Sequence, residues 1–203
     1  MRYVIGVTGG IASGKSQVCK IIKDSGYNVI DCDQIARESS KIGKPMYKAI
    51  LDHYGRGYLL PDGNIDRYKL GQLVFNDSLQ REILNNLTHP IIIEELKKQI
   101  TSYEGLIFVE MPLLFESKLE LMFDRIICVY LNKKLQINRL MLRDDIDQQY
   151  AKSKIESQLD LKYKKKRSHY VIDTGGDLNK TRAETISILQ KIEGELLYGN
   201  SWN

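Results

Sequence analysis

A glycine-rich stretch near the start of the chain combines residue types and spacing that suit the binding of a phosphate. Residues 9–16 read Gly-Gly-Ile-Ala-Ser-Gly-Lys-Ser and match the pattern G-x-x-x-x-G-K-[ST]. Glycine lets the backbone fold closely around a phosphate, with its N–H groups directed inward. Lys15 would reach the β- and γ-phosphates, and the Ser16 hydroxyl would ligate Mg²⁺. The pattern predicts binding of a nucleoside triphosphate but does not specify the reaction.

The segments before and after this stretch are predicted to be a strand and a helix, which would hold it in position. Residues 3–7 are apolar and partly β-branched, which predicts a buried strand. Val18, Ile21 and Ile22 have the spacing of one helix face, and the first turn of that helix would add unpaired N–H groups. A glycine-rich turn without function is the alternative, which this context disfavours. The residues predicted to bind the nucleotide are Gly10, Ile11, Ala12, Ser13, Gly14, Lys15, Ser16 and Gln17.

Two acidic residues follow the next predicted strand, residues 27–30. Asp31 and Asp33 would lie at the carboxyl edge of the sheet, where open α/β sheets bind ligands. One interpretation of Asp33 is a general base for a substrate hydroxyl, held beside the phosphate-binding loop. The other is a cap for the helix predicted to start near Gln34. The residues alone do not decide between them.

Another acid ends the strand predicted over residues 106–109. Glu110 has the position of a carboxylate that orients Mg²⁺ or its waters. This pattern is not specific, because any strand can end in an acidic residue.

A later helix carries two arginines on one face, Arg139 and Arg143. Guanidiniums followed by the polar stretch 144–149 are typical of a lid that neutralises charge on a moving phosphoryl group. A solvated helix with an ion pair between Arg143 and Asp147 is the alternative. The phosphate-binding loop favours the lid.

Residues 38–104 show mixed helical patterning and no second buried strand. The dipeptide His89-Pro90 should break the helical pattern, since proline fits the first turn of a new helix. A helical insertion at this place is where a kinase would hold its phosphate acceptor, with Arg67 and His89 as polar candidates. A surface salt bridge for Arg67 and a helix cap for His89 are equally open.

The composition is that of a globular protein. The chain has 203 residues, of which 42% are hydrophobic and 28% charged, enough for one domain with a core. Its apolar runs are too short to span a bilayer, and the first strand starts too early for a signal peptide. Cys19, Cys32 and Cys128 lack metal-ligand spacing and are expected to be buried free thiols. We expect a cytoplasmic protein without a membrane partner.

The charge balance does not predict a nucleic-acid partner. A net charge of +4 suits polyanionic substrates but is too small to argue for nucleic acid. The dense basic run at residues 162–167 is better explained as a solvated helix face. A non-catalytic ATP-binding module that uses this run on nucleic acid is the alternative from outside the enzymes.

Predicted strands and helices alternate along the chain, with the last strands at residues 124–131 and 169–172. Five such strands predict an α/β fold, a P-loop NTPase-type three-layer sandwich with a mainly parallel sheet. A GTPase would need the guanine-binding motif N-K-x-D. The nearest stretch, residues 132–135, reads Asn-Lys-Lys-Leu and has leucine in place of the aspartate. These features point to a small-molecule or nucleotide kinase.

We expect one kinase domain over 1–203, with its core at about 1–37 and 105–203, a helical acceptor-binding insertion at about 38–104 and an Arg-bearing lid at about 139–155.

Several motifs occur in a characteristic order. They are residues 7–16, Asp31 with Asp33, residues 63–67, residues 73–75, His89-Pro90, Pro-Leu-Leu-Phe-Glu at 112–116, Gln136 with Arg139 and Arg143, and Val-Ile-Asp at 171–173. In this order they resemble the dephospho-CoA kinase family over nearly the whole chain. The loop is common to many families, whereas the His-Pro and Pro-Leu-Leu-Phe-Glu pieces are much more specific.

The resemblance implies a reaction and its participants. ATP, with Mg²⁺ on Ser16, would phosphorylate the ribose 3′-hydroxyl of dephospho-CoA, the last step of coenzyme A synthesis. The implied catalytic residues are Asp33, Lys15, Arg139 and Arg143. The implied substrate-binding residues are Thr8, Asp31, Asp33, Arg67, His89, Glu110 and Pro112. A nucleoside or nucleotide kinase with another acceptor is the alternative, and a monomer or weak homo-oligomer is expected.

The chain departs from the family pattern at a few positions. Ala12 stands where glycine is also common, and Gln17 replaces the usual threonine. Glu110, Lys154 and Thr174 stand where Asp, Arg and Asn are expected. None of these changes removes a group that the chemistry needs.

Overall fold

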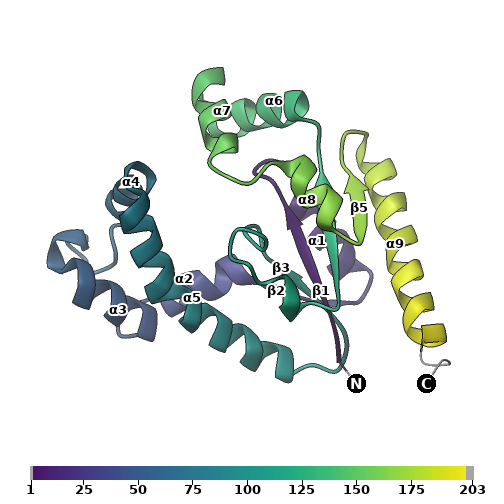
Figure 1. Ribbon diagram of the computed structural model, residues 1–203, viewed down its shortest axis with the longest axis horizontal. Coiled ribbons are helices and arrows are strands. Elements are labelled where there is room, and N and C mark those ends of the chain that lie inside the picture. The colour runs from purple at the N-terminus through teal and green to yellow at the C-terminus, as the bar shows by residue number, and fades with distance from the viewer. Residues whose placement is uncertain (1, 200–203) are drawn as a thin grey trace. The chain divides into compact units, whose positions relative to one another are not determined.

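The computed structural model describes residues 2–199, with side chains for residues 2–197. They form two compact units: one holds the described residues up to Ile30 and from Tyr103 onward, and the other is Asp31–Ser102 (Figure 1). The strands are β1 (Arg2–Gly9), β2 (Asn28–Asp31), β3 (Gly105–Glu110), β4 (Arg125–Tyr130) and β5 (Tyr170–Asp173). The first unit has helices α1 (Lys15–Asp24), α6 (Lys133–Asp144), α7 (Gln148–Glu156), α8 (Leu161–Arg167) and α9 (Leu178–Gly199), and a 3₁₀ turn at Glu120–Met122. The second has α2 (Cys32–Ser39), α3 (Pro45–Tyr54), α4 (Arg67–Asn76) and α5 (Ser78–Thr101), and a 3₁₀ turn at Arg56–Tyr58.

The five strands form one sheet in the order β2-β3-β1-β4-β5. Strand β1 pairs in parallel with β3 and β4, and β4 pairs in parallel with β5. In this register Val7 of β1 lies opposite Glu110 of β3 and Ile127 of β4. Parallel strands end at a common edge, so the loop after β1 and the acid that ends β3 are brought together. The predicted α/β fold with a mainly parallel five-stranded sheet is confirmed.

The main core lies where α1 and α9 cover the sheet (Figure 1). Ile5 and Val7 are fully buried there, together with Val18 of α1 and Ile192 of α9. Near-continuous apolar strands are the pattern expected for a parallel sheet covered by helices. Within residues 2–199, no helix is long and apolar enough to cross a bilayer.

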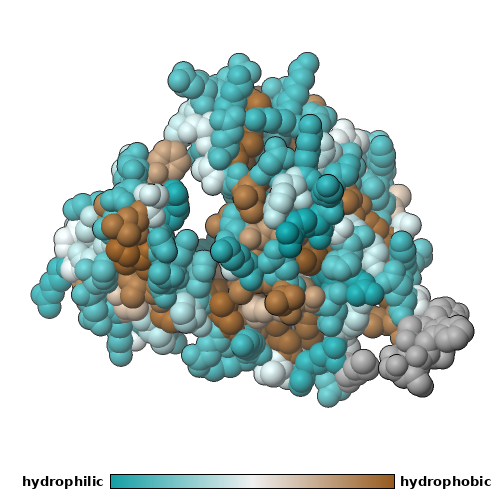
Figure 2. Space-filling view, in the orientation of Figure 1, coloured by the Kyte–Doolittle hydropathy of each residue, from teal (hydrophilic) through white to brown (hydrophobic). Residues whose placement is uncertain are grey.

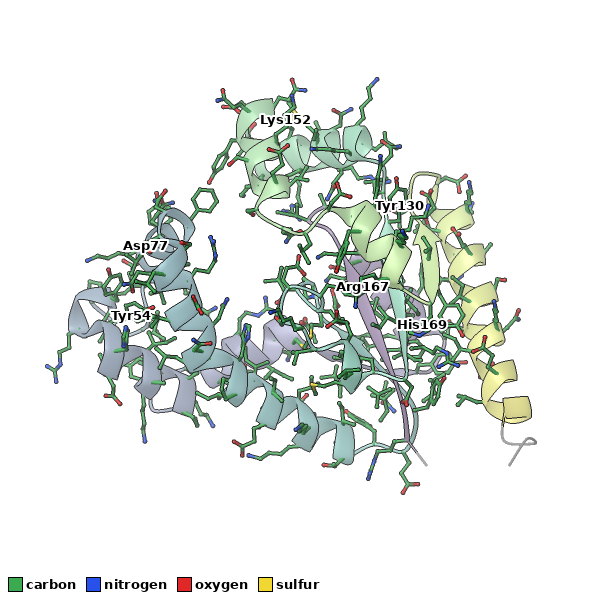
Figure 3. All side chains as sticks on the ribbon, in the orientation of Figure 1. Tyr54, Asp77, Tyr130, Lys152, Arg167 and His169 are labelled. Carbon is green, nitrogen blue, oxygen red and sulfur yellow. The ribbon has the colours of Figure 1, made fainter. Side chains whose placement is uncertain are left out.

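The helical unit has a core of its own, built from buried residues of α3, α4 and the loop between them, namely Met46, Tyr47, Ile50, Ile65 and Leu70. Two aspartates begin its later helices: Asp66 caps α4, and Asp77 caps α5. Tyr54 also donates to the carbonyl of Gln80 at 3.1 Å, close to Asp77 (Figure 3). On the face shown in Figure 2, apolar residues are exposed over α4 and the adjoining part of α5.

The predicted helix break at His89-Pro90 is wrong, because α5 is one helix of 24 residues, Ser78–Thr101, that contains Pro90. A proline inside a helix removes one backbone hydrogen bond and costs about 3 kcal/mol. Packing on both sides of Pro90 offsets this cost: Leu84 and Ile92 contact the core of the helical unit, and Leu96 is fully buried. Tertiary contacts thus override the local preference for a new helix.

The basic run at residues 162–167 is not wholly solvated, contrary to the prediction. Lys164 has no exposed side-chain area, and its Nζ lies 2.7 Å from Glu116 Oε1 and 3.1 Å from the carbonyl of Pro112. Glu116 Oε1 also accepts the backbone N–H of Leu159 at 3.0 Å. A buried ammonium needs such partners, because an unpaired charge in the interior is strongly destabilising.

The three cysteines are buried free thiols, as predicted. Burial raises the pKa of the Cys19 thiol, and it raises the pKa of Cys128 to about 12. Both groups are therefore protonated, and unreactive as nucleophiles, at neutral pH.

Replacing Lys164 tests the buried ion pair. Lys164→Met should lower the free energy of unfolding by ~3 kcal/mol or more, because it leaves the Glu116 carboxylate, which is only 21% exposed, without its cation. The exposed Lys166 provides the control, and Lys166→Met should change the value by less than about 0.5 kcal/mol. Urea denaturation followed by circular dichroism measures both.

A second substitution separates loss of charge pairing from loss of packing. The double variant Lys164→Met/Glu116→Gln should recover part of the lost stability, since no buried charge remains. Equal stability of the Lys164→Met and Lys166→Met variants would contradict the burial of this ion pair.

Candidate functional site

The loop between β1 and α1 presents backbone N–H groups at the start of α1. Gly14 caps α1 in a left-handed conformation, with φ of 88°, and no side chain supplies the cap hydrogen bond. Ala12 is also left-handed, with φ of 57°. Because no side-chain cap is bound to the first turn, its N–H groups and the positive end of the helix dipole can bind an anion. This backbone arrangement fits the phosphates that the sequence predicts there.

Two successive glycines, at the end of β1 and the start of the loop, leave little room for a Cβ. A Cβ on Gly9 would lie 2.6 Å from Ser13 Oγ and 2.8 Å from the carbonyl oxygen of Val129. A Cβ on Gly10 would lie 2.6 Å from Gln136 Nε2. The loop backbone therefore packs directly against β4 and α6.

The departure at Ala12 has both a cost and a compensation. A left-handed conformation costs a residue with a Cβ roughly 1–2 kcal/mol relative to glycine. Ala12, however, packs against the buried cluster formed by Ile137, Leu140 and Ala151. The alanine is tolerated because its methyl group contacts this cluster.

Lys15 forms a buried ion pair with Glu110 at the end of β3. The side chains of both residues are only 11% exposed. Cys19, one turn after Lys15, lies beside this pair. Burial and the nearby Glu110 carboxylate both raise the pKa of the Cys19 thiol. The sequence predicted that Glu110 orients Mg²⁺ or its waters, and in the structure its carboxylate contacts the lysine of the loop.

Two glutamines bind the backbone of Ile11, one at its carbonyl and the other at its N–H. Gln136 Nε2 donates to the carbonyl of Ile11 at 2.7 Å, and the Ile11 N–H donates to Gln158 Oε1 at 2.9 Å. A cavity of about 270 Å³ lies beside them, lined by Gly10 and residues of α6, α7 and α8. Gln136 is among the motifs that carry the family resemblance, whereas the sequence did not single out Gln158, because 147 residues separate it from Ile11.

Arg139 is held by the segment after β5. Its Nη2 donates to the carbonyl of Thr174 at 2.7 Å, and its Nη1 lies 3.3 Å from Thr174 Oγ1. The Thr174 hydroxyl also contacts the carbonyl of Ser13 at 2.6 Å. The Thr174 N–H donates to the carbonyl of Tyr130, labelled in Figure 3, at 3.0 Å. The structure thus brings Arg139 and the phosphate-binding loop together through Thr174.

Arg143 binds a different group. Its guanidinium contacts Asp144 through two hydrogen bonds, of 2.7 and 3.3 Å, and Lys154 Nζ lies 2.9 Å from the same carboxylate. These two cations lower the pKa of Asp144 to about 2, mainly through their hydrogen bonds. The alternative pairing of Arg143 with Asp147 is wrong, because Asp147 caps α7 by accepting from the N–H of Tyr150.

Asp31, the last residue of β2, and Asp33, in the first turn of α2, have different roles. Asp31 Oδ1 accepts the N–H groups of Asp33 and Gln34, at 2.8 and 3.1 Å, so Asp31 is the cap of α2. The interpretation of Asp33 as the helix cap is therefore wrong. Asp33 lies in the first turn of α2, where its carboxyl side chain is exposed. An aspartate two residues earlier already binds the N–H groups that a cap would need.

Three other polar candidates were Arg67, His89 and Thr8. Arg67 is exposed and donates from Nη2 to Ser40 Oγ, rather than forming the surface salt bridge considered from the sequence. His89 is not a helix cap, since it lies inside α5, where burial lowers its pKa. Thr8 is fully buried and donates from Oγ1 to the carbonyl of Pro112 at 3.1 Å.

A parallel sheet, a glycine-rich loop with a paired lysine and an arginine-bearing helix define a P-loop kinase. Among solved structures, TT1252 from Thermus thermophilus has a TM-score of 0.82 and 26% identity, and covers 94% of this chain and 97% of its own. Dephospho-CoA kinase from Campylobacter jejuni has a TM-score of 0.69 and 30% identity, over 98% and 100%. The family model described as dephospho-CoA kinase matches residues 3–180. The chain therefore belongs to the dephospho-CoA kinase family, as the order of its motifs predicted.

Curated relatives agree with this assignment. The dephospho-CoA kinase of Carboxydothermus hydrogenoformans is 40% identical over 192 residues, which are 93% of each chain. That of Bacillus cereus ATCC 10987 is 41% identical over 194 residues, 94% of this chain and 97% of its own. The chain is therefore a kinase, a transferase that uses ATP, and the non-catalytic alternative is not supported.

Adding a methyl group at Gly9 tests the fit of the loop. Gly9→Ala should destabilise the protein by about 1–3 kcal/mol and weaken Mg·ADP binding, because the Cβ collides with Ser13 and Val129. Gly71→Ala is the control: nothing lies within 4 Å of a Cβ at this position in α4. That change should be neutral or stabilising, since alanine favours a helix over glycine by roughly 1 kcal/mol.

Urea denaturation and calorimetric titration with Mg·ADP measure the two effects. The packing described for Gly9 would be contradicted if Gly9→Ala matched Gly71→Ala in both stability and Mg·ADP affinity.

Proposed function

We propose that this chain transfers the γ-phosphoryl group of ATP to the ribose 3′-hydroxyl of dephospho-CoA and so completes coenzyme A. Membership of the dephospho-CoA kinase family is the observation that carries the substrate assignment. The site supports the reaction type, because it joins a phosphate-binding loop to a paired lysine and an anchored arginine. We infer that the enzyme works in the cytoplasm, as a monomer or weak homo-oligomer, without nucleic acid.

The residues of the loop fit ATP and Mg²⁺. The N–H groups at the start of α1 would bind the phosphates, and the exposed Ser16 hydroxyl would ligate the ion. When bound, Mg²⁺ neutralises charge on the β- and γ-phosphates. Lys15, whose present partner is Glu110, would exchange part of that ion pair for phosphate oxygens. Because the lysine already lies at the loop, it needs no large rearrangement to do so.

We assign the acceptor to the helical unit. Asp33 would orient the 3′-hydroxyl and take its proton, and Asp31 supports it by accepting the Asp33 N–H. Arg67 and His89 would bind the acceptor, within the insertion predicted around residues 38–104. Exposed polar side chains such as Asp33 and Arg67 suit a soluble, charged substrate.

Two arginines would stabilise the transferring phosphoryl group. Arg139 is held in place by Thr174, whereas Arg143 must leave Asp144 before it can bind phosphate. The segment from about 139 to 155 would then exclude water, so that transfer is favoured over hydrolysis. Thr8, Glu110 and Pro112 complete the set of residues that we propose near the substrates.

ADP release tests the function directly. Mg·ATP should yield ADP at an appreciable rate only when dephospho-CoA is present, and coenzyme A should be the product. Nucleosides and nucleotides form the control panel. Release with one of those acceptors instead would assign another substrate, and no acceptor-dependent release from a folded, ATP-binding protein would overturn the proposal.

Removing the charge at Asp33 tests the proposed base. Asp33→Asn should lower kcat by ~10²-fold or more while leaving the Kd for Mg·ADP nearly unchanged. Asp52, an exposed carboxylate in α3, provides the matched control through Asp52→Asn. Steady-state kinetics and calorimetry separate the two quantities, and near-full turnover of Asp33→Asn would show that the assignment is wrong.

A further inference from the structure

Thr174 is a buried polar residue in contact with two parts of the site. It follows β5 and is only 3% exposed. Its Oγ1 lies 2.6 Å from the carbonyl of Ser13, 3.2 Å from the carbonyl of Tyr130 and 3.3 Å from Arg139 Nη1. A hydroxyl has one proton to donate and can also accept. The shortest contact, to Ser13, receives the proton, and the oxygen accepts from Arg139, which can only donate.

The bond to Ser13 orients a peptide of the phosphate-binding loop. The Ser13 carbonyl and the Gly14 N–H belong to one planar trans peptide unit, so they point in opposite directions. Holding the carbonyl toward Thr174 therefore directs the Gly14 N–H away from it. Thr174 also packs against the flank of Gly14, since a Cβ built there would lie 3.4 Å from three Thr174 side-chain atoms.

The bonds to Arg139 fix a guanidinium. Two nitrogens of its planar fork bind the hydroxyl and the carbonyl of the same residue, which determines the orientation of the plane. Neither partner is charged, so the positive charge of Arg139 is not neutralised by Thr174. Arg143, in contrast, is paired with the carboxylate of Asp144.

We infer that Thr174 is a positioning residue for phosphoryl transfer, which aligns the Ser13–Gly14 peptide of the loop with the Arg139 guanidinium before the nucleotide binds. The inference rests on the proposed role of Arg139 in that reaction. Groups held in place beforehand stabilise a transition state without reorganisation during the reaction. One hydroxyl thus links the phosphate-binding loop to the arginine helix.

Removing the hydroxyl at constant size tests this role. Thr174→Val should lower kcat with Mg·ATP and dephospho-CoA by about tenfold or more, because Arg139 loses part of its anchor. Thr174→Ser keeps the hydroxyl and should stay within about threefold of the parent enzyme. The matched control is Thr185→Val in α9. Thr185 is 1% exposed, and its hydroxyl donates to the carbonyl of Thr181 at 2.7 Å. That variant should lower the melting temperature but change kcat by less than about twofold.

Two further measurements separate positioning from general stability. The loss of kcat caused by Thr174→Val should shrink to less than about threefold in an Arg139→Ala background, since the arginine that it positions is gone. Calorimetric titration should show that Thr174→Val binds Mg·ADP more weakly than Thr174→Ser does. The difference should be present in the parent enzyme and in the Arg139→Ala background, because valine removes the hydrogen bond to Ser13 in both.

Three results would overturn the inference. The first is an unchanged kcat in Thr174→Val. The second is an equal loss of kcat in Thr185→Val at the same melting temperature. The third is a loss of kcat in the double variant Thr174→Val/Arg139→Ala that equals the product of the two single losses. Failure of the proposed function is distinguishable, because the parent enzyme would then release no ADP with dephospho-CoA. The Mg·ADP titration would still test the bond to Ser13 in that case.

Discussion

The geometry of the phosphate site depends on one buried ion pair, between Lys15 and Glu110. The side chains are 11% exposed, so each charge is balanced mainly by the other rather than by water. The parallel register produces this arrangement, because Val7 lies opposite Glu110 and the loop that holds Lys15 follows at the end of the same strand. Breaking such a pair leaves an uncompensated buried charge, which is strongly destabilising. The stability of the sheet and the position of Lys15 are therefore coupled.

The two arginines of α6 are held by chemically different partners. Arg139 binds a hydroxyl and a carbonyl, so its charge stays available to an incoming anion. Arg143 binds Asp144, a carboxylate that Lys154 also contacts. A phosphate has to compete with a carboxylate only at Arg143. If both arginines bind phosphate as we propose, Arg139 is already oriented for it, whereas Arg143 would have to exchange Asp144 for the ligand.

Local patterns predicted most of the fold and the phosphate-binding loop, because strand periodicity and motif spacing depend on near neighbours. The errors arise where distant contacts or competition decide the outcome. Pro90 stays inside a helix because both halves of that helix pack against other residues. Lys164 can be buried because it forms an ion pair with Glu116. Asp31, and not Asp33, is the cap of α2, since Asp31 accepts the N–H groups of Asp33 and Gln34. The contact between Thr174 and Ser13 spans 161 residues, so no local pattern could indicate it.

The burial of the native thiols makes this chain convenient for site-specific labelling. Cys19, Cys32 and Cys128 are all inaccessible, so a maleimide dye would leave them unmodified while the protein is folded. A cysteine introduced on the exposed surface of α7 would then be the preferred labelling point, with no need to replace the native residues first. Fluorescence from that point would test whether the proposed lid, residues 139 to 155, moves during turnover.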